Sequence, residues 1–112
     1  IKQVNVPMIT GIRLENQYIG DKIENIGIKK IVEYLSMLDE VTLNKFSEVN
    51  LKNSEQIIAY TVDSMYIRLG SSEQITNKAT LTNEILHELS DKKRPIEYID
   101  LNFSSPVIKF KQ

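Results

Sequence analysis

The sequence predicts an α+β fold, a mixed or antiparallel β-sheet with two main helices packed on it and an exposed terminal edge strand. Two observations support this prediction. Segments rich in β-branched and aromatic residues alternate with period two, and two other segments repeat apolar residues at helical spacing. The resulting order of helix, three strands, helix and two strands is typical of helices packed on a sheet.

Length and composition limit the possible classes of protein. The 112 residues are expected to form a single domain (1–112), because a chain of this length buries about two-thirds of its unfolded surface. The net charge of −1 comes without blocks of like charge, which argues against nucleic-acid or anionic-membrane surfaces. The absence of cysteine excludes disulfides and thiolate chemistry. The chain starts with Ile1, so we expect it to be part of a longer protein.

The first elements are a short strand, a loop and a helix. A strand is expected at Val4–Ile9 and a loop at Ile12–Asp21. A helix should run from Ile26 to about Asp39, because its apolar residues follow the i, i+3, i+4, i+7 spacing of one face. That face contains Ile28, Ile31, Val32, Leu35 and Leu38.

Three strands follow a connection at Thr42–Asn44. Phe46–Leu51 alternates as a strand does, and Gln56–Val62 and Met65–Leu69 form a hairpin around Asp63-Ser64. Alternation places Met65, Ile67 and Leu69 on one face and Tyr66 and Arg68 on the other. Gly70 ends the hairpin, where the backbone is expected to need a positive φ.

The second helix should begin with Thr76 or Asn77 as its cap and end near Ser90. Leu81, Ile85 and Leu89 form its apolar stripe. Together the two helices and the hairpin are expected to make one core. Its predicted members are Ile28, Ile31, Leu35, Met65, Ile67, Leu69, Leu81, Ile85 and Leu89.

Two closing strands, Ile96–Phe103 and Val107–Phe110, are joined at Ser104-Ser105-Pro106. Proline cannot donate a ladder hydrogen bond and is confined to sheet edges, strand starts and bulges. The last strand is therefore expected at an edge, where unpaired N–H and C=O groups can accept an extended partner. This pattern favours binding by strand addition over catalysis.

No constellation of catalytic or metal-binding residues is apparent in the sequence. His87 is the only histidine and is expected to face solvent, and no zinc-ligand spacing is present. The neighbouring carboxylates of Asp39 and Glu40 could act in acid/base chemistry, but a solvated loop is the favoured interpretation. Asp100 is expected to be an outward or salt-bridged strand residue. We therefore expect no catalytic residues, no metal and no cofactor.

Five segments resemble, in order, the extracytoplasmic β domain of the bacterial cell-division family FtsQ, called DivIB in Gram-positive bacteria. They are Val6–Gly11, Phe46–Leu51, the hairpin from Asp63 to Gly70, the helix with Lys78, Leu81, Ile85 and Leu86, and Ile99–Asn102. Asn102 stands where the family usually has Arg, and Ser64 replaces the hairpin Gly. The first departure removes any ion pair that the Arg would make.

The resemblance implies a non-enzymatic scaffold of the divisome on the extracytoplasmic face of the bacterial membrane, at the division septum. In the family, a transmembrane helix and a POTRA domain precede this domain, and both are absent from this fragment. The implied partners are FtsB/DivIC-like and FtsL-like division proteins, bound by β-strand addition, and the implied role is regulation of septal peptidoglycan synthesis. The alternative is a generic exported protein-interaction or substrate-recognition domain of another cell-envelope protein.

The candidate partner-binding residues are Phe103, Val107, Ile108, Lys109 and Phe110. The resemblance places Phe103 and Phe110 where partner-contacting aromatics of the family fall, and aromatics dominate interface hot spots. The alternative, that both rings close the core, stays open, above all for Phe103.

Overall fold

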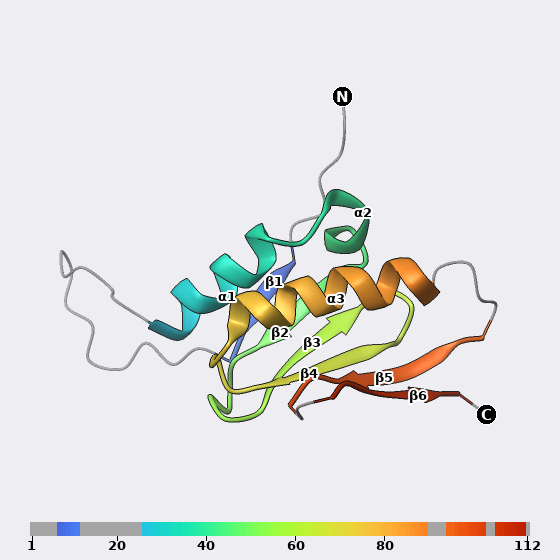
Figure 1. Cartoon of the computed structure of the whole chain (residues 1–112). Coiled ribbons are helices and arrows are strands. Elements are labelled where there is room, and N and C mark those ends of the chain that lie inside the picture. The colour runs from blue at the N-terminus through green and yellow to red at the C-terminus, as the bar shows by residue number, and fades with distance from the viewer. Residues whose placement is uncertain (1–6, 12–25, 90–93, 103–104, 112) are drawn as a thin grey trace, which may run out of the picture.

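The computed structural model describes residues 7–11, 26–89, 94–102 and 105–111. Its elements, in chain order, are β1 (Met8–Thr10), α1 (Ile26–Ser36), α2 (Glu40–Leu43), β2 (Phe46–Asn50), β3 (Ile57–Thr61), β4 (Tyr66–Gly70), α3 (Ile75–Leu89), β5 (Ile96–Asp100) and β6 (Val107–Phe110). Figure 1 shows the helices in one layer and the strands in another.

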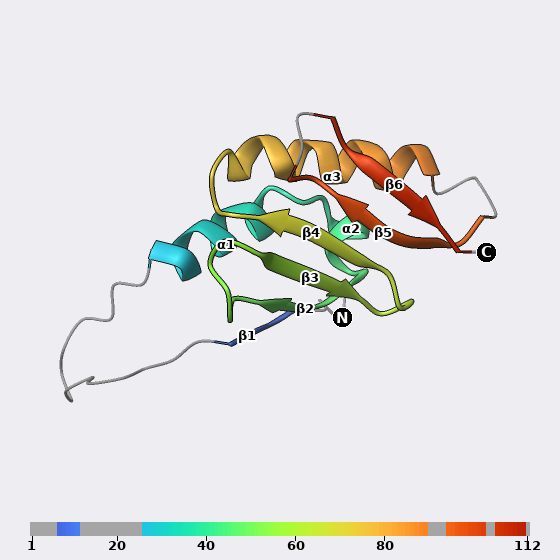
Figure 2. The same cartoon turned by 90° about the horizontal axis from the view of Figure 1, so that it is seen from below.

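The strands form one six-stranded open sheet whose spatial order is the chain order, β1-β2-β3-β4-β5-β6. β1 and β2 are parallel, as are β4 and β5, and the other neighbours are antiparallel. The helices lie on one face, and Figure 2 shows the strands from the opposite face. The predicted α+β fold with a mixed sheet is confirmed, and β6 is an edge strand.

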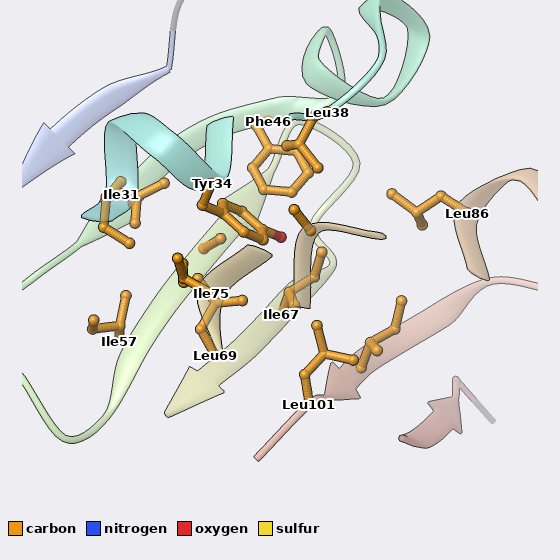
Figure 3. Packing of buried hydrophobic residues seen from close by; sticks show 14 of the residues in the cluster. Ile31, Tyr34, Leu38, Phe46, Ile57, Ile67, Leu69, Ile75, Leu86 and Leu101 are labelled. Carbon is orange, nitrogen blue, oxygen red and sulfur yellow. The ribbon is translucent and has the colours of Figure 1, made fainter. Parts of the chain in front are cut away.

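The core lies between α1, α3 and the helix-facing side of the sheet (Figure 3). Its fully buried side chains come from both layers, because alternate strand residues point toward the helices. The largest are Tyr34, Phe46, Ile31, Ile57, Ile67, Leu69, Ile99 and Val49. The helix-facing side of the hairpin is as predicted, since Met65, Ile67 and Leu69 are all buried.

The buried stripe of α1 differs from the predicted one. Ile31, Tyr34 and Leu38 are buried, whereas Val32 is 51% exposed and the prediction for it was wrong. At 100° per residue, a stripe centred on Ile31 and Tyr34 turns Val32 away from the sheet. Leu35 is only partly buried against the core. The Tyr34 hydroxyl was not expected inside, but it lies 2.8 Å from the Thr82 hydroxyl, a buried hydrogen bond between α1 and α3.

Two further predictions of local structure were wrong. The segment predicted as a connection at Thr42–Asn44 is largely the short helix α2, which Asp39 caps by accepting a hydrogen bond from the Thr42 amide at 2.8 Å. α3 begins at Ile75, so Thr76 and Asn77 lie in its first turn instead of capping it. The helix starts earlier than predicted because this places the Ile75 side chain, which is only 2% exposed, in the core.

The buried face of α3 contains polar residues that an apolar pattern cannot reveal. Its buried members are Ile75, Lys78, Ala79, Thr82, Ile85 and Leu86. Leu81 and Leu89 of the predicted stripe are partly buried at its margins. The helix ends at Leu89, close to the predicted Ser90.

Gly70 has the positive φ expected of it, +70°. A Cβ at this position would also clash with the side chain of Asn102, so the end of β4 and the residues after β5 share one tight space. β1 begins at Met8, inside the predicted Val4–Ile9 strand. Residues 4–6 of that prediction and the loop predicted at Ile12–Asp21 lie outside the described residues.

Candidate functional site

The candidate site is the outer edge of β6, which pairs on one side with β5. Val107 lies opposite Asp100, Ile108 opposite Ile99 and Lys109 opposite Tyr98. Among the described residues, no strand pairs with its other side. An extended segment can therefore be added there without displacing any described strand.

One hydrogen bond just past the end of β6 shows which main-chain groups of this strand point toward β5. The Lys111 amide donates to the Pro95 carbonyl at 2.8 Å, so the main chain of Lys111 faces β5. Main-chain direction alternates along a strand, so Lys109 and Val107 also face β5. The main-chain N–H and C=O groups of Ile108 and Phe110 therefore point away from the sheet, where a partner strand would lie.

The side chains of β6 divide between the two faces of the sheet. Val107 is 43% exposed, and Lys109 is also exposed, on the face opposite the helices. Ile108 and Phe110 are partly buried on the helix-facing side, where Ile108 packs against the core. The Arg94 guanidinium lies 4.2 Å from the centre of the Phe110 ring, a cation–π contact. Phe110 is thus partly buried and in contact with Arg94, while its main-chain N–H and C=O groups point away from the sheet.

Two ion pairs flank this edge. Lys109 Nζ lies 3.2 Å from a carboxylate oxygen of Glu97, with both side chains about half exposed. Asp100 is buried and lies 3.9 Å from an Arg68 guanidinium nitrogen. Asp100 also accepts a hydrogen bond from the Asn102 amide at 2.9 Å. The prediction of a salt-bridged strand residue at Asp100 is confirmed.

The other candidate groups for chemistry lie apart from this edge. His87, on the exposed side of α3, lies 2.5 Å from Asp39, so α2 and α3 are linked at the surface. Hydrogen bonds from the Thr42 amide and from His87 lower the pKa of Asp39. Within the described ranges, no three acidic, histidine or cysteine side chains are grouped as a metal site would need.

The comparison with known families agrees with this architecture. The model for "Cell division protein FtsQ/DivIB, C-terminal" matches residues 2–102. The chain belongs to this family. It is therefore a cell-division domain. No curated protein matches the chain.

The matched residues of the FtsQ/DivIB family end at Asn102, so β6 lies beyond them. The assignment of β6 as a binding edge therefore depends on its geometry. The described helices are each too short or too polar to cross a lipid bilayer.

The structure describes four of the five predicted binding residues of this FtsQ/DivIB domain. Val107, Ile108, Lys109 and Phe110 form β6, and Phe103 lies outside the described residues.

Tyr60 on β3, Tyr66 on β4 and Tyr98 on β5 lie opposite one another on the helix-free face of the sheet. Sequence reasoning placed Tyr66 on the outer face of the hairpin but did not identify this row. Tyr60, Tyr66 and Tyr98 each stand next to a buried residue in alternating strands, so their spacing carried the signal.

Proposed function

We propose that this FtsQ/DivIB domain is a non-catalytic scaffold of the division machinery that binds partner proteins by β-strand addition to β6. The partners are FtsB/DivIC-like and FtsL-like division proteins, bound on the extracytoplasmic face of the membrane at the septum. Through them the domain helps to regulate septal peptidoglycan synthesis. The observation that carries the proposal is the outward direction of the main-chain groups of Ile108 and Phe110.

Strand addition fits the chemistry of this edge. Main-chain hydrogen bonds to an added strand supply affinity that does not depend on sequence, and side chains at alternate positions supply specificity. Pro106 precedes β6 and cannot donate a hydrogen bond, which is compatible only with an edge, a bulge or a strand start. The exposed Val107 and Lys109 would meet the partner's side chains on the helix-free face.

The non-catalytic assignment is tested by the metal content of the domain. We expect the purified domain to contain no stoichiometric zinc by elemental analysis. A tightly bound equimolar metal would contradict the non-catalytic assignment.

The sharpest test compares two substitutions at one position. Ile108→Pro and Ile108→Ala both remove the partly buried side chain, but only proline removes the outward N–H. The affinity for the outer domain of a DivIC-like partner is measured by calorimetry, after circular dichroism and urea unfolding show that both variants fold.

Ile108→Pro is expected to bind the partner about tenfold more weakly than Ile108→Ala. This difference corresponds to the loss of roughly one main-chain hydrogen bond across a dry interface. Equal affinities of the two variants would overturn strand addition at β6. The same pair, introduced into the full-length protein, separates a divisome scaffold from a generic envelope domain. Ile108→Pro should impair septum formation in a cell that depends on this protein, whereas a generic domain would leave division unchanged.

A further inference from the structure

The edge strand β6 has a composition that favours pairing with a second copy of itself. Its sequence is Val107-Ile108-Lys109-Phe110, in which Lys109 is the one charged residue among apolar ones. Figure 2 shows β6 as the outermost strand on its side of the sheet. Apolar edge strands with unpaired main-chain groups associate with one another unless the edge is protected. Whether two copies of β6 fit each other depends on the register in which they would pair.

The main-chain direction of β6 limits these registers. In a twofold dimer the two edge strands run antiparallel, because the same surface meets itself across the axis. Only residues whose main-chain groups point outward exchange hydrogen bonds there, and in β6 these are Ile108 and Phe110. The first register pairs Ile108 with Phe110 of the second copy, and the second pairs Ile108 with Ile108. A further shift in either direction leaves a single residue of β6 opposite the other β6.

The first register brings two lysines together. Its twofold axis passes through Lys109, so Lys109 lies directly opposite Lys109 of the second copy, in the kind of pair whose side chains approach most closely. Both side chains are exposed on the helix-free face, and like charges directly opposite each other destabilise a sheet. Glu97 lies 3.2 Å from Lys109 Nζ, but it belongs to β5, on the inner side of β6. It therefore does not stand between the two lysines.

The second register fails at a proline. Lys109 would lie opposite Val107, without repulsion, but Phe110 would lie opposite Pro106 of the second copy, just before β6. The outward carbonyl of Phe110 would need a donor at that position, and the proline nitrogen carries no hydrogen. By symmetry the same bond is missing at both ends of the paired strands. Main-chain groups that lose water without gaining a partner weaken the association. Pro106 thus disfavours the register that Lys109 allows.

Both obstacles arise because the strand would meet its own sequence. A strand of another sequence need not place a lysine opposite Lys109. It also need not extend to the position opposite Pro106, since Ile108 and Phe110 supply the outward groups. The same edge can therefore reject a second copy and accept a different chain.

We propose that Lys109 and Pro106 together prevent β6 from pairing with a second copy of this chain, and so keep the edge of each copy open. Each residue blocks one of the two central registers, and neither blocks both. Lysine and proline are residues with which natural proteins protect sheet edges. The inference goes beyond the proposed function, because it rests on the direction and register of β6 and requires no particular partner.

The first test measures self-association of the domain alone by sedimentation equilibrium at submillimolar concentrations. Lys109→Val removes the charge from the first register, and Pro106→Ala supplies the missing donor in the second. Lys29→Val is the matched control, because it removes an exposed lysine from α1, in the other layer. Lys109→Val and Pro106→Ala are each expected to associate about tenfold more tightly than the wild type, and Lys29→Val like the wild type. Adding Ile108→Pro to either variant should abolish the gain, and urea unfolding checks each fold.

A mixing experiment separates charge repulsion from a general loss of solubility. Lys109→Glu should stay monomeric by itself, because two carboxylates would then oppose each other. Mixed with the wild type, it should form a heterodimer, because a carboxylate would face the Lys109 ammonium group. Fluorescence anisotropy of labelled Lys109→Glu, titrated with the unlabelled wild type, measures this pairing. High salt should weaken it, since salt screens exposed charge pairs.

The outcomes that contradict the proposal are distinct. Association of Lys109→Val no tighter than that of Lys29→Val, or no heterodimer in the mixture, would overturn the role of Lys109. A monomeric Pro106→Ala would overturn the role of Pro106. A wild type that already dimerises, with the dimer lost in Ile108→Pro, would overturn both. No partner protein is present in these measurements, so the proposed function is judged separately by the partner affinities of Ile108→Pro and Ile108→Ala.

Discussion

The ammonium nitrogen of Lys78 on α3 lies 2.6 Å from the carbonyl oxygen of Leu69 at the end of β4. It also donates to the Ser71 carbonyl at 2.8 Å, and the residue is only 8% exposed. These bonds tie the helix to the turn that leads into it. Burial penalises the charged form and lowers the pKa of Lys78. Lys78, which the sequence alone suggests to be a surface lysine, thus links the helix layer to the sheet from inside the domain.

Lys78→Met should destabilise the domain although methionine fills a similar volume. The substitution leaves the carbonyls of Leu69 and Ser71 without their described donor, which costs about 1–3 kcal/mol for buried groups. Urea unfolding at neutral pH measures the loss. An unchanged midpoint would show that the desolvation cost of the ammonium cancels both hydrogen bonds.

The difference in unfolding free energy between the wild type and Lys78→Met should depend on pH. Because the pKa of Lys78 is lower in the folded state, the unfolded chain binds more protons in the window between the folded and unfolded values. The wild type should therefore gain stability relative to Lys78→Met as the pH rises toward about 10.4. A constant difference between neutral pH and that value would contradict the lowered pKa.

Substitutions along α1 should separate its buried face from its exposed face. Ile31→Ala is expected to cost about 2–5 kcal/mol, because Ile31 is fully buried. Leu35→Ala should cost less, since Leu35 is only partly buried, and Val32→Ala should stay within about 0.5 kcal/mol. Chemical unfolding of the three variants gives the order. A larger loss for Val32 than for Ile31 would mean that the helix is rotated.

Asp39 should matter to stability through its cap on α2. Asp39→Ala is expected to cost about 1 kcal/mol at neutral pH, and Asp39→Asn should cost less because asparagine also caps. The pKa of Asp39 is lowered in the folded state, so its contribution is present above the unfolded pKa and is lost as pH falls through the folded value. The penalty of Asp39→Ala should therefore shrink below about pH 4. Thermal unfolding of the variants at several pH values would show it.

Phe110→Ala should weaken partner binding by at least about 2 kcal/mol while the domain stays folded. Phe110 is partly buried at the edge strand and holds Arg94 over its ring, so Arg94→Ala serves as the companion variant. If Arg94→Ala alone reproduces the loss, the aromatic ring acts through that contact. Normal binding after deletion of residues 107–112 from a folded domain would refute the edge as a site.

The elements that follow a simple hydrophobic period were predicted well from the sequence. The hairpin of β3 and β4 shows why, because Met65, Ile67 and Leu69 alternate strictly with Tyr66 and Arg68, and only one face could be apolar. The positive φ of Gly70 followed from its place after that hairpin. The closing strands followed from Pro106 and the alternation around it.

The errors arose where polar atoms complete the core or local capping decides the structure. Tyr34 and Thr82 are buried because their hydroxyls bond each other, and Lys78 because two carbonyls receive it. A pattern of apolar residues contains none of these pairings, since each of them joins polar atoms. α2 exists because Asp39 caps it, and a four-residue helix carries too few positions to show a period.

The agreement between strand order and chain order has a consequence for how the domain folds. Hairpins β2–β3, β3–β4 and β5–β6 bring together segments that are close in sequence, so their loops close at small entropic cost. Only the parallel pairs, β1 with β2 and β4 with β5, require a crossover through a helix. Such pairing is intrinsically slower than hairpin closure. These two parallel pairings are therefore the steps expected to limit the folding rate, whereas the three hairpins can form locally.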